Sequence, residues 1–90
     1  MRLDLFLKVA RIVKRRSAAR EMISLGAVRV CKAVVRPSKD LKPGDIVEVA
    51  FPRKIVTLRV ISVEESVVRR GDGAFEIIEE RAVTGDERPW

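Results

Sequence analysis

The chain has 90 residues, enough for one small domain, and this length excludes enzyme architectures that join a nucleotide-binding fold to a substrate domain. Hydrophobic residues make up 47% of the chain and aromatic residues only 4%, so the expected core is small and aliphatic. The 19 Lys and Arg residues outnumber the 13 Asp and Glu residues, and the net charge of +6 points to a polyanionic partner, most often nucleic acid.

Two short amphipathic helices are predicted first. Apolar residues near the N-terminus recur at the i, i+3, i+4, i+7 spacing of one helix face, and these are Leu3, Phe6, Leu7 and Ala10. Ser17 is the predicted N-cap of a second helix, because its hydroxyl can accept a hydrogen bond from an unpaired backbone N–H. Gly26 is expected to end that helix, since glycine adopts the left-handed C-terminal conformation at least cost.

Beyond residue 27 the apolar period changes to two, which is typical of strands. Strands are predicted over residues 28–30, 33–35, 46–49, 55–61 and 75–79, with a polar loop over 69–73. The expected fold is α+β, with an N-terminal helical hairpin packed on a small, mostly antiparallel β-sheet. Residues 1–83 are expected to form a single domain whose C-terminal part extends the sheet, followed by a frayed tail at 84–90.

Missing residue types restrict the chemistry. The chain contains no His, the commonest general base and metal ligand, and no Gly-rich phosphate loop, so we expect no enzyme and no catalytic residues. The single cysteine, Cys31, excludes an internal disulfide and fits a reducing compartment. The N-terminus lacks the long apolar run of a signal peptide, and no run could span a bilayer. We expect a cytoplasmic protein with no metal, no cofactor and no membrane contact.

The positive charge is concentrated in the first half of the chain. Residues 1–45 hold 12 Lys and Arg against 4 acids, a net charge of +8, whereas residues 46–90 hold 7 against 9, a net charge of −2. The densest run comprises Lys8, Arg11, Lys14, Arg15, Arg16 and Arg20. Such a run can be a solvated face, but the asymmetry favours contact with nucleic acid through this half. Arg69 and Arg70, in the predicted distal loop, are expected to matter little.

Five segments carry a resemblance to a known family. They are RLD at 2–4, KRRSAA at 14–19, I-x-x-G-x-V-x-V at 23–30, PS at 37–38 and PGDIV at 43–47. In this order and spacing the chain resembles the RNA-binding domain first described in ribosomal protein S-four, also called the alpha-L RNA-binding motif. The core of the resemblance covers about residues 1–50. It implies structured-RNA binding by shape and backbone rather than by base stacking.

One position departs from the family, which usually has Asn-Gly at the hairpin turn where this chain has Cys31 and Lys32. A two-residue type I′ turn needs positive φ at both positions, which these side chains adopt reluctantly. We therefore expect a longer turn, or a turn of another type.

The candidate RNA-binding residues differ in what supports them. Arg16 and Arg20 lie one helical turn apart and could follow a row of phosphates, while Lys14 and Arg15 precede the helix near its positive end. The resemblance implies that Arg2 contacts phosphate and that Asp4 orients an Arg or accepts a hydrogen bond from a ribose hydroxyl. The remaining candidates, whose alternative is plain solvent exposure, are Lys8, Arg11, Arg29 and Lys32.

Within the family, the chain is most similar to the short stand-alone bacterial proteins of ribosome-associated quality control at the P site, which are related to heat-shock protein fifteen. This similarity lies in the start MRLDLFLKV and the later KRR. The chain ends in an acidic segment, whereas heat-shock protein fifteen has a long basic C-terminal tail. The resemblance implies a monomer that binds the obstructed large ribosomal subunit through rRNA and peptidyl-tRNA. It would stabilise the P-site tRNA while a partner elongation factor adds a C-terminal tail to the stalled chain.

Two alternatives remain open. One is a factor like heat-shock protein fifteen that recycles stalled large subunits. The other belongs to a different class: a basic module whose patch meets an acidic protein surface.

Overall fold

The structure is a computed structural model that describes residues 1–71 and 73–83; the tail expected at 84–90 lies outside the described residues. In this part of the chain the helices α1, α2 and α3 span Leu3–Val9, Arg16–Ser24 and Glu65–Arg70. The strands β1 to β5 span Val28–Val30, Ala33–Val34, Ile46–Phe51, Lys54–Val60 and Phe75–Ala82. They pair antiparallel throughout, in the order β2-β1-β3-β4-β5, which confirms the expected α+β fold.

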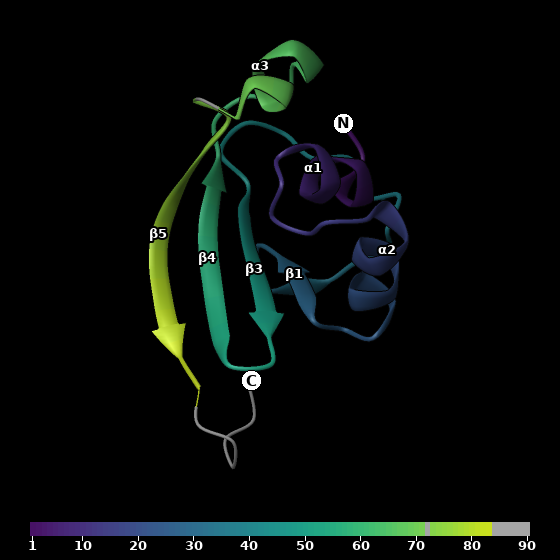
Figure 1. Cartoon of the computed structure of the whole chain (residues 1–90), viewed down its shortest axis with the longest axis vertical. Helices are drawn as coiled ribbons and strands as arrows, with labels where there is room; N and C mark the ends of the chain where they lie inside the picture. Colours follow the sequence, from purple (N-terminus) through teal and green to yellow (C-terminus); the bar gives the residue numbers. More distant parts are fainter. Residues whose placement is uncertain (72, 84–90) are drawn as a thin grey trace.

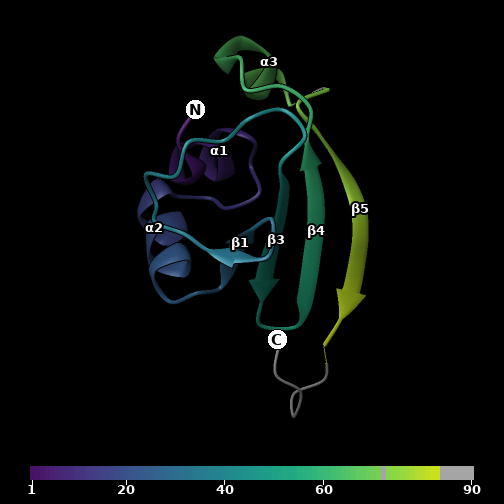
Figure 2. The same ribbon diagram turned by 180° about the vertical axis from the view of Figure 1, so that it is seen from behind.

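The helical hairpin and the long strands occupy different parts of the molecule. Figures 1 and 2 show α1 and α2 beside β1 and β3, while β4 and β5 continue the sheet away from the helices. The short helix α3 lies at one end of the sheet and contacts α1. The C-terminal part of the chain therefore returns to the helical hairpin at this end.

The core is aliphatic, as composition predicted, and it lies between the helical hairpin and the sheet. Leu7 of α1, Ile23 of α2 and Leu58 of β4 are all 0% exposed. Phe6 of α1 meets Phe75 of β5 edge to face, with ring centroids 6.3 Å apart. This contact connects the first helix to the last strand of the sheet.

The second helix ends as predicted but begins differently. Gly26 has φ +79°, and its N–H donates to the Ile23 carbonyl, so it ends α2 in the left-handed conformation. The prediction that Ser17 caps this helix is wrong. Arg15 occupies the N-cap position, with no side-chain cap hydrogen bond to a described residue, and Ser17 lies inside the first turn. An ion pair between Arg16 and Asp4 of α1 connects this end of α2 to the first helix.

The hairpin turn between β1 and β2 also differs from expectation. Val30 pairs with Ala33, leaving a two-residue connection in which Cys31 has φ 50° and Lys32 has φ 67°. The prediction of a longer or different turn is therefore wrong. Positive φ at both positions matches the twist of the flanking strands, and the Cys31 N–H donates to the Ile46 carbonyl at 2.7 Å. Pairing on β3 thus holds a turn that these side chains alone would disfavour.

The segment before β5 holds a helix that the sequence interpretation missed. Helix α3 spans Glu65–Arg70 and ends at Gly71, which has φ 71°; residues 69 and 70 were predicted to lie in a loop. One residue, Val68, supplies its fully buried contact at 0% exposure. A helix this short leaves almost no periodic signal, because tertiary packing provides most of its stability.

Candidate nucleic-acid interface

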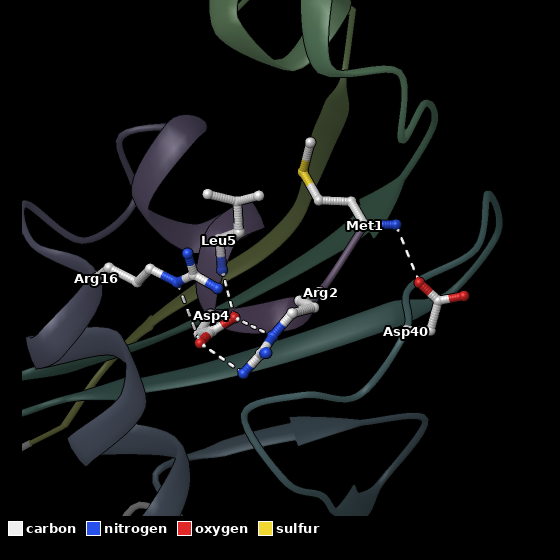
Figure 3. A network of polar contacts seen from close by, with 6 residues as sticks. All are labelled: Met1, Arg2, Asp4, Leu5, Arg16 and Asp40. Atoms are coloured by element: carbon white, nitrogen blue, oxygen red, sulfur yellow. Dashed lines mark hydrogen bonds and ion pairs between the residues drawn. The ribbon is translucent and has the colours of Figure 1, made fainter.

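A buried carboxylate near the start of α1 holds two arginines at the surface (Figure 3). Asp4 is 0% exposed, whereas the side chains of Arg2 and Arg16 are 49% and 44% exposed. Arg2 binds with both prongs of its guanidinium, Nε to Oδ1 at 3.2 Å and Nη2 to Oδ2 at 3.3 Å. Arg16 donates from Nε to Oδ2 at 3.3 Å. We call these residues the Asp4 cluster; Asp4 orients two arginines and is itself out of reach of a ligand.

The ionised form of Asp4 is favoured by its partners. Burial raises the pKa of the Asp4 carboxyl, but the hydrogen bond from Arg16, the Leu5 N–H at 2.8 Å and the charges of Arg16 and Arg2 outweigh it. The pKa therefore lies below its ordinary value of 3.8. The carboxylate stays charged at neutral pH and neutralises one of the two guanidinium charges, so the cluster keeps a net charge of +1.

The chain around Asp4 is fixed by the segment 37–41. The N–H of Leu3 donates to the Lys39 carbonyl at 2.8 Å, and the N–H of Asp4 donates to the Pro37 carbonyl at 3.2 Å. The N-terminal ammonium of Met1 lies 3.0 Å from Asp40 Oδ1 (Figure 3). These contacts hold the residues before α1 against a loop that is distant in sequence, so the Asp4 cluster has a rigid backbone.

A second group of cations surrounds a hollow of about 270 Å³ at the other end of α1. Its lining residues are Lys8, Val9, Arg11, Lys14 and Arg69. Lys8, Arg11 and Lys14 were predicted from the sequence, and the structure brings them together. We call this group the basic hollow.

The contribution of Arg69 to the basic hollow was not predicted. Arg69 was placed in a distal loop, where its charge was expected to matter little, but α3 carries it to the C-terminal end of α1. That placement was wrong because the short helix was missed. Glu65 and Arg69 at i, i+4 were the available signal, and they form an ion pair of 3.4 Å in the structure.

The other predicted residues lie outside these two groups. Arg15, at the N-cap position, and Arg20, on α2, are exposed, and neither forms an ion pair with a described residue. Lys32 is exposed at the tip of the β1–β2 hairpin, and Arg29 is partly buried in β1, opposite Glu48 of β3. The sheet order places this hairpin at the edge opposite β5.

The described residues offer few other kinds of chemistry. No group of three or more His, Cys, Asp or Glu side chains among them could hold a metal ion. In the same part of the chain, every helix is too short or too polar to cross a membrane. Cys31 is exposed, with its Sγ 3.9 Å from Asp45 Oδ1.

Comparison with known proteins identifies the family. Residues 1–47 match the S4 domain, the S-four family that the sequence resembles, and this range contains both the Asp4 cluster and most of the basic hollow. The chain belongs to the S4 domain family. Arg69 and α3 lie beyond the matched S4 domain.

Relatives of this S4 domain protein match over most of their length. The RQC P-site tRNA stabilizing factor of Streptococcus pneumoniae is 39% identical over 84 residues, covering 92% of this chain and 96% of that protein. The factor of the same name from Halalkalibacterium halodurans is 34% identical over 88 residues, covering 97% and 100%. The Bacillus subtilis factor is 41% identical over 66 residues, covering 73% and 77%. These matches confirm the predicted resemblance to the quality-control branch of the family.

A solved structure supports the fold independently. Heat shock protein 15 of Vibrio cholerae, described as trimeric, matches with a TM-score of 0.77 over 86% of this chain and 80% of that one. The two sequences are 24% identical, so this likeness concerns the fold.

Proposed function

We propose that this protein acts in bacterial ribosome-associated quality control by binding the large ribosomal subunit that is obstructed by peptidyl-tRNA. It contacts rRNA and peptidyl-tRNA together and stabilises the tRNA in the P site while a partner elongation factor tails the stalled chain. The names of relatives that are 34–41% identical support this role. Binding and positioning are the whole mechanism, so the protein is a cytoplasmic binding protein and not an enzyme.

The Asp4 cluster is the observation that carries this proposal. A guanidinium has five N–H donors in a fixed fork. Arg2 uses two of its donor atoms on Asp4 and Arg16 uses one, so both retain donors at the surface. Because Asp4 restrains both side chains before binding, less side-chain entropy is lost when they meet RNA. Such fixed donors suit a rigid RNA whose phosphates lie at set positions.

The proposed interface extends from the Asp4 cluster over the basic residues of the helical hairpin. Asp4 serves as a positioning residue, and the RNA contacts come from Arg2, Lys8, Arg11, Lys14, Arg15, Arg16, Arg20, Arg29 and Lys32. Residues 1–83 act as a single RNA-binding domain and the protein works as a monomer. Among described aromatic residues, Phe6 is buried, Phe75 packs against it, and Phe51 ends β3 with the ammonium of Lys54 over its ring at 5.7 Å. None of the three belongs to the proposed contact set, so the interface recognises backbone and shape.

Sedimentation with purified large ribosomal subunits tests this function. At near-physiological salt, where most non-specific affinity is lost, the protein is expected to sediment with subunits that carry peptidyl-tRNA. Arg16→Glu is expected to abolish this association, because it places a second carboxylate beside Asp4. Arg53→Glu, the same reversal in the exposed turn between β3 and β4, is the matched control and should sediment like wild type (Figure 1).

The alternatives predict different results. Equal sedimentation with subunits that lack peptidyl-tRNA would contradict the P-site role and favour a recycling factor like heat shock protein 15, whose fold this chain shares. Co-purification with one acidic protein after nuclease treatment would instead indicate a protein-interaction module.

A further inference from the structure

The basic hollow combines residues from segments that are distant in sequence. Lys8 comes from the last turn of α1, Arg11 and Lys14 come from the connection between α1 and α2, and Arg69 comes from α3. The first three lie within the matched S4 domain, whereas Arg69 lies outside it. A hollow of about 270 Å³ is many times the space that one water needs, so an anionic group fits.

The charge of the hollow is poorly compensated within the described residues. Lys8, Arg11 and Lys14 form no ion pair with any of them. Arg69 has Glu65 at 3.4 Å, but the two side chains are 59% and 54% exposed, so water screens this pair strongly. In the Asp4 cluster, by contrast, a buried carboxylate offsets the positive charge. Cations gathered around a concave surface without a counter-charge raise the local concentration of anions.

The backbone of Arg11 gives a second, independent observation. The N–H groups of Arg11 and Ile12 donate to the carbonyls of Lys8 and Leu7, so α1 ends in the same motif as α2. In α2 the left-handed position is held by Gly26, whereas in α1 it is held by Arg11 with φ 63°. A side chain in this conformation strains the backbone, and glycine would relieve that strain. The chain has a charged side chain at this strained position, and that side chain lines the hollow.

We infer that the basic hollow binds a phosphate group of the RNA backbone, and that α3 extends the RNA interface beyond the S4 domain through Arg69. This inference rests on the proposed function. The lining favours phosphate over a base, because Val9 is its only apolar residue in the described part and no aromatic ring is available for stacking. Lysine ammonium groups and arginine forks are the side chains that hold phosphate oxygens.

The salt dependence of binding to large subunits carrying peptidyl-tRNA tests the inference. Each phosphate contact makes the negative slope of log K against log salt steeper by about 0.7–0.9. Arg69→Ala is therefore expected to make the slope shallower by this amount, which is about a fivefold loss of affinity at 0.15 M salt. Arg70→Ala removes the same charge from the next position of α3, outside the hollow lining, and is expected to bind like wild type. Equal slopes for Arg69→Ala and Arg70→Ala would overturn the inference.

Two further variants separate charge from folding. Glu65→Gln frees Arg69 from its carboxylate partner and is expected to raise affinity. Arg11→Gly removes a cation from the hollow and relieves the backbone strain, so it is expected to weaken binding with an unchanged or higher melting temperature. Weaker binding with a lower melting temperature would mean that Arg11 acts through the fold, which would overturn its role here.

The same measurements distinguish this inference from the proposed function. If Arg16→Ala makes the salt slope shallower and Arg69→Ala does not, the inference about the basic hollow is wrong and the proposed function stands. If neither variant changes the slope, the helical hairpin does not bind RNA. Inorganic phosphate at matched ionic strength is the second probe. Phosphate could raise the melting temperature of wild type but not of Arg69→Ala, while wild type and Arg69→Ala have equal salt slopes for binding to the subunits. The hollow would then bind free phosphate instead of RNA. A complex with an acidic protein that survives nuclease and requires Arg69 would equally overturn the RNA assignment.

Discussion

The two ends of α1 present positive charge in opposite ways. At its N-terminal end, Arg2 and Arg16 are held by a carboxylate that is 0% exposed. At its C-terminal end, the cations of the basic hollow have, among described residues, only the exposed Glu65 as an acidic partner. The first arrangement fixes where the donors point, and the second concentrates charge. A surface can thus separate geometric selectivity from electrostatic attraction while using the same residue types.

The largest effect on stability is expected from a change that destabilises α1 and so disrupts both the Asp4 cluster and the basic hollow. Leu7 is 0% exposed, and its carbonyl accepts hydrogen bonds at the end of α1. Leu7→Ala is expected to lower the free energy of unfolding by about 2–5 kcal/mol, because it leaves a cavity beneath the helix that carries both groups. Chemical denaturation measures this change. Leu25→Ala is the matched control, since Leu25 is 77% exposed, and its stability should stay close to that of wild type.

Asp4→Asn disrupts the Asp4 cluster and leaves the basic hollow intact. The amide keeps the shape of the side chain but loses the charge-assisted hydrogen bonds to Arg2 and Arg16, so we expect a loss of about 1–3 kcal/mol in stability. The variant is more positive than wild type, so its binding to arbitrary RNA at low salt should strengthen. Its binding to subunits carrying peptidyl-tRNA at near-physiological salt should weaken. If both affinities rise, charge alone governs recognition and the Asp4 cluster selects nothing.

The pH dependence of stability isolates the same carboxylate. Because the folded-state pKa of Asp4 is lowered below 3.8, ionised Asp4 stabilises the fold at pH values above its unfolded pKa. That contribution is lost as the pH falls from about 3.8 through the folded-state pKa. Wild type and Asp4→Asn should therefore differ in unfolding free energy at neutral pH and converge in strong acid. A difference that stays constant down to the lowest pH would mean that the charge of Asp4 does not stabilise the fold.

Sequence patterns predicted features that depend on local spacing. The apolar residues of α1 and α2 recur over about two turns in each helix, and Gly26 ends α2 at the position its backbone freedom favours. The placement of Arg16 and Arg20 one turn apart on the same helix also follows from helical spacing alone. The family resemblance added the role of Asp4 as an orienting group. Its partner Arg2 is two residues away, but local spacing does not reveal the second partner, Arg16, which lies 12 residues away.

The errors occurred where distant contacts override local preference. Cys31 and Lys32 adopt positive φ because β1 pairs with β3 on its other side. Ser17 does not cap α2, because the helix already begins at Arg16, whose side chain contacts Asp4 of α1. Helix α3 is six residues long and is positioned by packing, so its sequence carries little signal, and Arg69 could not be placed beside α1.

The smallest expected effect comes from removing one charge at a time, one helical turn apart on α2. Arg16→Ala and Arg20→Ala should each make the negative salt slope of binding to large subunits shallower by about 0.7–0.9, since each removes one phosphate contact. Their stabilities should differ. Arg16 hydrogen-bonds Asp4 at 3.3 Å, so its loss is expected to cost about 1 kcal/mol, whereas Arg20 has no ion-pair partner among the described residues and its loss should cost almost nothing. Equal stabilities together with equal slopes would contradict this comparison: Arg16 would then be an ordinary exposed cation like Arg20, and its hydrogen bond to Asp4 would not stabilise the fold.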